Sequence, residues 1–315
     1  MGDSSGLRGG RDILHRWRGN PIVKQEDLAF PCLDIMNAGA VKCNDHYAML
    51  VRVEDMRGRS VFVPARSQDG IHFTLGAHSS LSPAKEGEFA RFESRGVEDP
   101  RITKLDGVFY VMYTAYSGYG TRLALAKTED FEKIERVALI SEPDNKNGAL
   151  FPEKINGRYA RLERPRDGGN IWISYSDDLI YWGSSVPVMA PRGGGYWDSN
   201  RVGCAAPPIR IKEGWLMTYY GVKSTSGGPI FRLGAAVLDA DDPAKVLKRT
   251  SVPLLTPRET YERIGDVGNV VFSCGAVLED DDELRVYYGA ANEAICLGTA
   301  HLSEVLDNCL PGGGV

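Results

Sequence analysis

An acidic residue stands directly before an apolar run in the segment GVEDPR (96–101), which leads into ITKLDGVFYVMY (102–113). Pro100 restricts the backbone of Asp99 to extended conformations, so the carboxyl group is held at the entry to a strand. An Asp-Pro pair alone is a weak signal of a functional site. Asp99 therefore needs partners contributed by other parts of the chain.

Polar residues follow several of the apolar runs at comparable points. These strand ends read RVED (52–55), YSGY (116–119), RPRD (164–167), YYG (219–221) and ANE (291–293). Any one of them is explained by an ordinary turn. As a set of carboxylates, arginines and tyrosines, they are expected to converge on one cavity.

Short runs rich in Val, Ile, Tyr, Phe and Trp recur between Gly, Asp, Asn and Pro, which predicts an all-β chain. The clearest runs are YAMLVRV (47–53), VFYVMYTAY (108–116), RYARLER (158–164), GWLMTYYGV (214–222) and ELRVYYGAA (283–291). Their centres lie roughly 50 to 70 residues apart, a spacing typical of repeated supersecondary units. Five units predict a five-bladed β-propeller, in which the inner strands line a central channel.

A second motif supports that number of units. Small or polar residues, an Asp and then apolar residues follow the main run in ARSQDGIHF (65–73), AKTEDFEKI (126–134) and SYSDDLIYWG (174–183). Looser copies are LGAAVLDADDP (233–243) and LGTAHLSEVL (297–306). We expect a single catalytic domain over residues 13–309, with flexible tails at 1–12 and 310–315.

Composition restricts the class of protein. With 315 residues, 43% hydrophobic and 25% charged, the chain has the makeup of a soluble globular protein. A net charge of −5 argues against a nucleic-acid partner bound through phosphates. We also expect no membrane span, because no run of 18 apolar residues occurs.

Metal and cofactor chemistry is not indicated either. The five histidines and six cysteines are scattered without ligand spacing, so no metal site is predicted and the thiols are expected to be reduced. The acidic run DDDE (280–283) is interpreted as a solvated turn. Neither GGG (193–195) nor GG (227–228) has the context of a nucleotide-binding loop, and we expect no cofactor.

Ten ordered segments resemble glycoside hydrolase family 130, the mannoside phosphorylases and related β-mannosidases. They are RWRGNPI (16–22), NAGAV (37–41), VRVED (51–55), ARSQDGI (65–71), EDPR (98–101), NKNGALFPEKINGRYARLERP (145–165), EGWLMTYYG (213–221), LGAAVLDADDPAKVLKR (233–249), DVGNVVFSCGAV (266–277) and YYGAAN (287–292). The resemblance covers nearly the whole chain and implies a five-bladed β-propeller.

The resemblance implies inverting phosphorolysis of β-mannosides. Inorganic phosphate, as co-substrate, attacks a terminal β-mannosyl residue and releases α-mannose 1-phosphate and a shortened acceptor. Asp99 matches the family's general acid, whose proton passes through a hydroxyl of the mannose. A phosphorylase needs cations for phosphate, whereas an inverting hydrolase needs a second carboxylate as base.

Motif matches assign the remaining site residues. The expected phosphate-binding residues are Lys146, Asn147, Arg164, Arg201 and Tyr220. The expected substrate-binding residues are Asn37, Arg52, Asp55, Tyr116, Asp198 and Asn292. Trp197 is a candidate stacking residue, although aromatic residues in such a fold are more often part of the core.

Three positions depart from the family pattern. Tyr220 stands where His is frequent, Asn292 where Asp is usual, and Glu163 where His is frequent. Glu163 in principle offers a hydrolytic base, but adjacent residues on a strand face opposite ways. If Arg164 faces the channel, Glu163 points into the blade and is paired there.

Two alternatives to phosphorolysis remain at this stage: a β-mannosidase of the same fold, and a propeller that binds glycans without catalysis. The linkage and the acceptor sugar stay open. The polar N-terminus lacks a secretory signal, so we expect a cytoplasmic protein, a monomer or a homo-oligomer.

Overall fold

The computed structural model describes residues 12–312, in which β-strands make up most of the chain. The all-β prediction is confirmed. The helices are short: η1 (Gln25–Asp27), α1 (Gly87–Phe92), η2 (Asp167–Gly169), α2 (Thr260–Arg263) and α3 (Leu302–Asp307). None of the helices within residues 12–312 is long and apolar enough to span a membrane.

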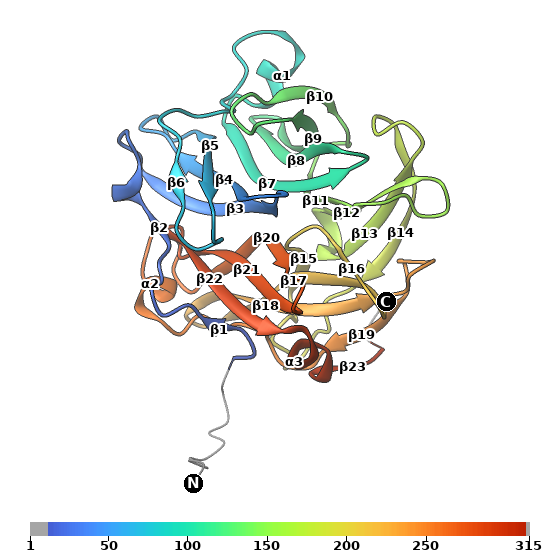
Figure 1. The fold of residues 1–315 in the computed structure, drawn as a ribbon. Helices are drawn as coiled ribbons and strands as arrows, with labels where there is room; N and C mark the ends of the chain where they lie inside the picture. The colour runs from blue at the N-terminus through green and yellow to red at the C-terminus, as the bar shows by residue number, and fades with distance from the viewer. Residues whose placement is uncertain (1–11, 313–315) are drawn as a thin grey trace.

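The first half of the chain forms an eight-stranded sheet made of two antiparallel runs (Figure 1). The strands of the first run are β3 (Asp34–Lys42), β4 (Tyr47–Glu54), β5 (Ser60–Ser67) and β6 (Thr74–Leu75). Those of the second are β7 (Gly96–Leu105), β8 (Val108–Ser117), β9 (Gly120–Thr128) and β10 (Glu135–Leu139). A single parallel pair, Ser60 with Gly96, joins the two runs.

Three further sheets follow. One contains β11 (Asn145–Leu150), β12 (Tyr159–Pro165), β13 (Ile171–Ser176) and β14 (Trp182–Met189). The next contains β15 (Arg201–Cys204), β16 (Ile209–Ile211), β17 (Gly214–Thr225), β18 (Gly228–Leu238), β19 (Val246–Thr250) and β23 (Cys309–Pro311). The last contains β20 (Val271–Leu278), β21 (Glu283–Ala290), β22 (Ala294–His301), β1 (His15–Arg16) and β2 (Val23–Lys24).

Both ends of the described chain are held by strands. β1 and β2 pair with β22, so residues from the start of the chain complete the last sheet. β23 pairs with β19, which places Leu310 and Pro311 in a sheet and not in the flexible tail predicted for 310–315. Asp12 accepts hydrogen bonds from Arg16 and Arg258. Residues 1–11 and 313–315 of the predicted tails lie outside the described residues.

The predicted Asp motif forms the same turn in four places. Oδ1 of Asp69, Asp130, Asp178 and Asp239 accepts hydrogen bonds from the backbone N–H groups two and three residues further on. An Asp side chain that closes its own turn in this way explains why the motif repeats after each main strand. The fifth copy differs, because residues 297–306 run from β22 into α3.

Apolar side chains pack between neighbouring sheets in five clusters. Four clusters take residues from one antiparallel unit and from the next along the chain, and the fifth contains residues of both β3–β5 and β20–β22. Strands buried on both faces read as continuous apolar runs, as Tyr47–Val53 does. The hydrophobic core is therefore divided into layers between the sheets.

The first strands of the successive units approach one another in the interior (Figure 1). β3 contacts β7 and β20, β7 contacts β11, and β11 contacts β15. Gly39 allows one of these close approaches, because a Cβ atom there would lie 2.4 Å from the Pro100 carbonyl oxygen. The segment that carries Asp99 is thus packed directly against β3.

Replacing this glycine tests the packing. We expect Gly39→Ala to lower the free energy of unfolding by about 1–3 kcal/mol, because backbone atoms must move to admit the methyl group. Gly183→Ala, on β14 with no atom within 4 Å of the added Cβ, is the control. Equal urea unfolding midpoints for the two variants would contradict the packing described here.

Candidate functional site

Backbone bulges bring polar side chains into the interior. The register shifts at Asn37 in β3, at Asp99 and Pro100 in β7, and at Asn147 and Gly148 in β11. Asn37, Asp99 and Asn147 have positive φ angles of 42°, 56° and 58°, so Asp99 does not adopt the extended conformation predicted from Pro100. Asn and Asp tolerate this left-handed region better than most residues, and a bulge redirects the side chain it carries. Three successive units therefore present an amide or carboxyl group at the same structural position.

The carboxylate of Asp99 is 6% exposed and is held by two side chains from neighbouring strands. Its Oδ1 accepts a hydrogen bond of 2.8 Å from Asn37 Nδ2 and one of 2.8 Å from Arg52 Nη1. Burial raises the pKa of this carboxyl group, but the charges of Arg52, Arg101 and Lys146 outweigh burial and lower the pKa to about 2. Asp99 is therefore ionised at neutral pH in the free protein.

Glu98 joins the surroundings of Asp99 to those of Lys146. Its Oε1 accepts a hydrogen bond of 2.9 Å from Arg52 Nη2, and its Oε2 accepts one of 3.0 Å from Lys146 Nζ. Glu98 was not among the site residues predicted from the sequence. It belongs to the EDPR segment, but the sequence of that segment does not indicate which residues Glu98 contacts.

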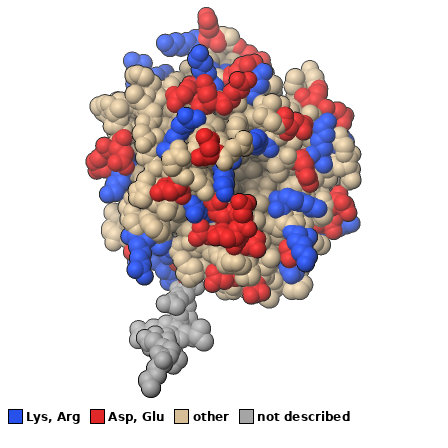
Figure 2. All heavy atoms as spheres, viewed as in Figure 1, with Lys and Arg blue, Asp and Glu red and all other residues tan. Residues whose placement is uncertain are grey.

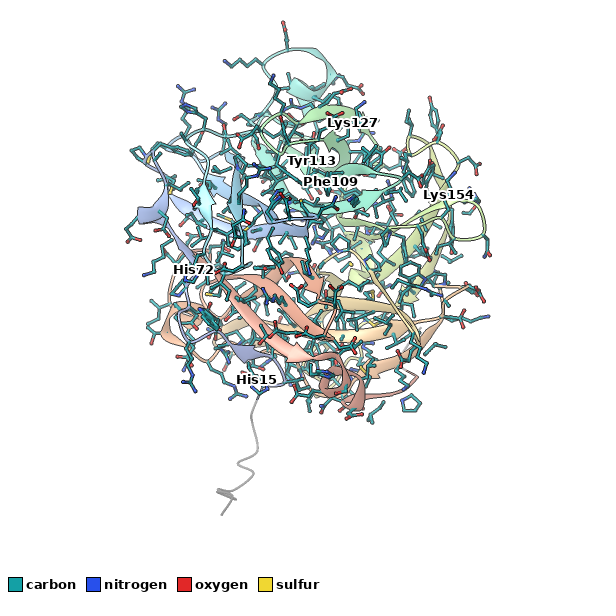
Figure 3. All side chains as sticks on the ribbon, in the orientation of Figure 1. His15, His72, Phe109, Tyr113, Lys127 and Lys154 are labelled. Carbon is teal, nitrogen blue, oxygen red and sulfur yellow. The ribbon has the colours of Figure 1, made fainter. Side chains whose placement is uncertain are left out.

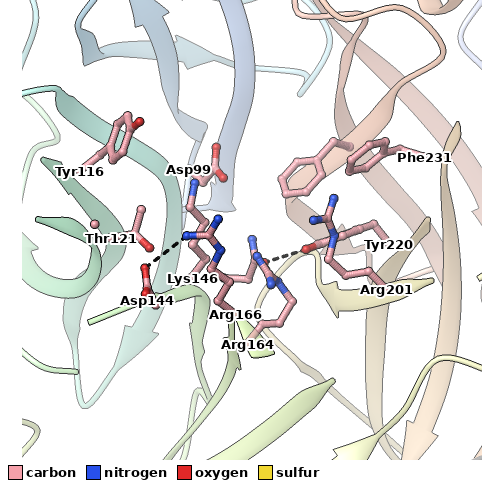
Figure 4. Close-up of a pocket in the computed structure, with 13 residues that line it drawn as sticks. Asp99, Tyr116, Thr121, Asp144, Lys146, Arg164, Arg166, Arg201, Tyr220 and Phe231 are labelled. Carbon is pink, nitrogen blue, oxygen red and sulfur yellow. Dashed lines mark hydrogen bonds and ion pairs between the residues drawn. The ribbon is translucent and has the colours of Figure 1, made fainter. Parts of the chain in front are cut away.

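A pocket of about 420 Å³ opens beside Asp99 (Figure 4). Its lining residues are Asp99, Tyr116, Gly120, Thr121, Asp144, Lys146, Asn147, Arg164, Arg166, Arg201, Tyr220, Phe231 and Phe272. All five predicted phosphate-binding residues are in this set, together with Asp99 and the predicted substrate residue Tyr116. Segments far apart in the sequence thus contribute to one pocket.

Basic groups gather around a central amide. Oδ1 of Asn147 accepts a hydrogen bond of 3.0 Å from Arg164 Nε and one of 2.9 Å from the Tyr220 hydroxyl. The guanidinium carbon of Arg201 lies 5.6 Å from the centre of the Phe231 ring, and its buried Nε has no hydrogen-bond partner among the described residues. A pocket wall with Lys and Arg donors of this kind is suited to an oxyanion such as phosphate.

The opposite walls of the pocket differ in character (Figure 4). Tyr220 stacks on Phe231 with ring centroids 5.9 Å apart and packs against Phe272, which makes an aromatic wall. On the other side, Lys146 Nζ lies 5.7 Å from the centre of the Tyr116 ring. These rings supply the apolar surface on which a sugar face can pack.

Asp144 and Arg166 form an ion pair at the rim of the pocket. Neither residue was predicted from the sequence to belong to the site. Their closest N and O atoms lie 3.8 Å apart, and both side chains are largely exposed. Arg166 was part of a strand end named in the sequence, whereas nothing in the sequence distinguished Asp144 from the other turn acids. Asp144 is the second carboxylate lining the pocket, and it faces a cation.

Asn37 and Arg52 contact Asp99 directly, although they are not among the residues that line the pocket. Arg52 is fixed further by a hydrogen bond of 2.8 Å from its Nε to Ser60 Oγ. Both residues were predicted to bind substrate. In this structure they hold the carboxylate of Asp99.

Three predicted substrate residues are not brought to the pocket. Asp55 sits in the β4–β5 turn, where it accepts hydrogen bonds from the backbone of Arg57 and Arg59. Asn292 sits in the β21–β22 turn with a φ of 60°. Neither is among the residues that line the pocket.

Asp198 is the third and is fully buried. Its carboxylate accepts hydrogen bonds from Arg192, from Arg249 and from the Tyr219 hydroxyl. Trp197 beside it stacks on Tyr219 and belongs to the core, as the alternative interpretation held. Asp198 is not among the residues that line the pocket, and these partners hold its carboxylate within the core.

The prediction that Glu163 points away from the pocket is confirmed. Glu163 accepts hydrogen bonds from Asn145, Arg161 and Ser174 within its own sheet. Arg164, the next residue, lines the pocket. A carboxylate engaged in this way is not placed to activate a water molecule beside Asp99.

Charged groups elsewhere on the surface are mixed in sign. On the face shown in Figure 2, Lys and Arg side chains are interspersed with Asp and Glu.

Within residues 12–312 no group of three or more His, Cys, Asp or Glu side chains is arranged to hold a metal ion. His15 and His72, for example, lie well apart near the edge of the molecule (Figure 3).

A family model described as β-1,4-mannooligosaccharide phosphorylase matches residues 35–310. The chain belongs to glycoside hydrolase family 130. Three curated relatives that match the chain are named as β-mannoside phosphorylases, which are enzymes of the glycosyltransferase type.

Three relatives illustrate the range of substrates in their names. A β-1,2-mannobiose phosphorylase of Listeria innocua is 42% identical over 77% of this chain and 66% of its own length, just under two thirds. A 1,2-β-oligomannan phosphorylase of Thermoanaerobacter is 36% identical over 86% of this chain and 91% of its own. A β-1,4-mannooligosaccharide phosphorylase of Ruminococcus albus is 31% identical over 94% and 91%.

Solved structures agree in fold. The structure of the Listeria innocua β-1,2-mannobiose phosphorylase in complex with β-1,2-mannobiose has a TM-score of 0.84. It is 32% identical in sequence and covers 94% of this chain and 98% of its own. The family member described here therefore shares the architecture of that enzyme over nearly its whole length.

The ion pair at Asp99 predicts a pH dependence of stability. A carboxyl group whose pKa is lowered on folding stabilises the protein above its unfolded pKa, and this contribution disappears as the pH falls toward about 2. Asp99→Asn removes the contribution. We expect the variant to be less stable than the wild type by about 2 kcal/mol at pH 6, with the difference shrinking below about pH 4.

Urea unfolding measured between pH 3 and pH 7 checks this. Asp106→Asn, which changes an exposed turn Asp with a φ of 51°, controls for the amide substitution at a left-handed position. If the Asp99→Asn variant and the wild type lost stability in parallel as the pH fell, the folded environment assigned to Asp99 would be incorrect.

Proposed function

We propose that this family 130 member catalyses inverting phosphorolysis of β-mannosides, with Asp99 as general acid. The observation that carries the proposal is the pairing of one carboxylate with three basic side chains, Lys146, Arg164 and Arg201, around a single pocket. A hydrolase would need a second carboxylate to deprotonate water. Asp144 is paired with Arg166 at the rim, and Glu163 is engaged within its sheet.

The reaction follows from that arrangement. A phosphate oxygen attacks the anomeric carbon as the bond from that carbon to the glycosidic oxygen breaks. The electron pair of the broken bond goes to the acceptor oxygen, which receives the proton of Asp99 through a hydroxyl of the mannose. The products are α-mannose 1-phosphate and an acceptor with a free hydroxyl group.

The roles of the binding residues follow from charge and donor geometry. Arg164 and Arg201 offer planar guanidinium donors to phosphate, Lys146 offers a point charge, and the Tyr220 hydroxyl and the Asn147 amide add neutral hydrogen bonds. Tyr116, Phe231 and Phe272 provide surfaces for sugar rings. Asn37 and Arg52 keep Asp99 in position.

We propose a β-1,2-linked mannobiose or oligomannan as the preferred substrate. The relatives with identities of 36% to 42% described above are named for β-1,2 linkages, whereas the β-1,4 relative is 31% identical. The solved structure with a TM-score of 0.84 contains β-1,2-mannobiose. These likenesses support the linkage, and the pocket itself admits a small saccharide.

The arrangement of the sheets supports a closed five-bladed propeller as the single catalytic domain, spanning residues 13–309 with a further contribution from β23. Five apolar clusters each join one unit to the next, and one of them joins the last sheet to the first. We place the enzyme in the cytoplasm, where phosphate is available and the charged product is retained.

Incubation with β-1,2- and β-1,4-mannobiose, with and without phosphate, tests the proposal. We expect phosphate-dependent α-mannose 1-phosphate, with the higher kcat/KM on the β-1,2 disaccharide. Mannose 1-phosphate and free mannose are measured separately. Free mannose formed at a rate independent of phosphate would identify a hydrolase, and binding of mannobiose without either product would identify a glycan-binding protein.

Two substitutions separate the acid from the phosphate site. Asp99→Asn should lower kcat by roughly 10²- to 10⁴-fold, since the leaving oxygen loses its proton donor. Arg164→Ala should raise the KM for phosphate by about tenfold to a hundredfold, because a charged hydrogen-bond donor is lost. Arg158→Ala, an exposed arginine just before β12, is the matched control and should leave both constants unchanged. An unchanged phosphate KM in Arg164→Ala would place the phosphate elsewhere.

A further inference from the structure

Four charged side chains form an alternating series from the pocket to the acid. Lys146 Nζ lies 3.0 Å from Glu98 Oε2, Arg52 Nη2 lies 2.9 Å from Glu98 Oε1, and Arg52 Nη1 lies 2.8 Å from Asp99 Oδ1. Glu98 and Asp99 are nearly buried, while Lys146 is about one third exposed toward the pocket. The series connects a predicted phosphate ligand to the predicted general acid.

We propose that Glu98 is a positioning residue that couples phosphate binding at Lys146 to protonation of Asp99. This inference rests on the proposed function and assigns a role to a residue that is not among those lining the pocket. Glu98 competes with phosphate for Lys146. Glu98 also forms an ion pair with Arg52, so the charge of Arg52 is divided between Glu98 and Asp99.

The charges facing Asp99 show how the coupling works. Arg52 on β4, Arg101 on β7 and Lys146 on β11 all favour the ionised form of its carboxyl group, while Asn37 on β3 donates a hydrogen bond. Cys274 on β20 also interacts electrostatically with Asp99, and burial raises the pKa of this thiol. When phosphate binds Lys146, its negative charge opposes that cation. Asp99 then takes up the proton that the reaction requires.

Glu98→Gln is expected to bind phosphate more tightly but to turn over more slowly. The variant loses a competing anion at Lys146, so the KM for phosphate should fall by about two- to fivefold, as a partly exposed ion pair permits. It also loses a negative charge near Asp99, whose carboxyl group then holds its proton less well. We expect kcat to fall about tenfold at pH 7.

The pH profile provides an independent readout. Activity that depends on a protonated acid declines as the pH rises through the pKa of that acid. Because Glu98→Gln lowers this pKa, the decline should begin about one pH unit lower than in the wild type. A purely structural role for Glu98 would lower kcat without moving the profile or tightening phosphate binding.

Folding of the variant is supported by the contacts that remain, since Arg52 keeps its hydrogen bonds to Ser60 and Asp99. Glu93→Gln is the matched control. Glu93 is a buried glutamate bound to Arg136 and Tyr113 outside the pocket, so its replacement should affect stability but neither the phosphate KM nor the pH profile. An unchanged or higher phosphate KM in Glu98→Gln, or an unmoved profile, would overturn the proposal.

Calorimetry tests the coupling without turnover. Titrating the wild type with inorganic phosphate alone, in two buffers of different ionisation enthalpy at pH 7, should show net proton uptake that Asp99→Asn abolishes. Phosphate binding with equal proton exchange in the wild type and in Asp99→Asn would overturn the coupling while leaving phosphorolysis intact. Absence of phosphorolysis in the wild type would instead overturn the proposed function.

Discussion

Arg101 is the buried contact on which the geometry of the site depends. Its side chain is only 1% exposed, and its guanidinium group donates hydrogen bonds to three backbone carbonyl oxygens, those of Ala205, Cys204 and Asp99. It therefore joins β7 to the end of β15 through the interior of the molecule. The bond to the Asp99 carbonyl holds the bulge in its left-handed conformation, and the charge below the bulge favours the ionised acid. A carbonyl oxygen buried without such a donor would be costly.

The bulges explain how a repetitive fold produces a site with distinct members. β3, β7 and β11 shift register at equivalent points, and each shift directs a different side chain, Asn37, Asp99 or Asn147, toward the interior. A regular ladder would have buried these groups between sheets, since alternate residues of a central strand face the two apolar layers. The repeated architecture fixes the positions, and the residue at each position supplies the chemistry.

Much of this site was predictable from the sequence, and the exceptions share a physical cause. Asp99, Lys146, Arg164, Arg201 and Tyr220 were identified from motifs, and all line the pocket. The direction of Glu163 followed from strand alternation alone. Residues in turns were harder to place, because a turn does not impose the alternation that orients a strand residue.

Asp55, Asp198 and Asn292 show that difficulty. Asp55 and Asn292 lie in turns between strands, and Asp198 lies in the loop before β15. Arg192 and Arg249, which bind Asp198, come from parts of the chain that give no sequence signal of pairing.

Glu98 was missed for a related reason, since its partners on β4 and β11 are set by tertiary packing. The short β23 was missed because pairing with β19, and not its own composition, makes it a strand.

The charge balance of the free pocket also bears on why phosphate, and not water, would be the nucleophile. Without phosphate bound at Lys146, the effect of the cations around Asp99 prevails, and its pKa of about 2 leaves the acid ionised. An ionised carboxylate cannot protonate a leaving oxygen, so a water molecule in the pocket finds no acid to assist it. In the mechanism we propose, phosphate brings both the nucleophile and the negative charge that lets Asp99 hold its proton. On the proposed mechanism, water does not have to be excluded from the pocket to prevent hydrolysis. Asp99 is protonated, and so able to act as an acid, only when phosphate is bound.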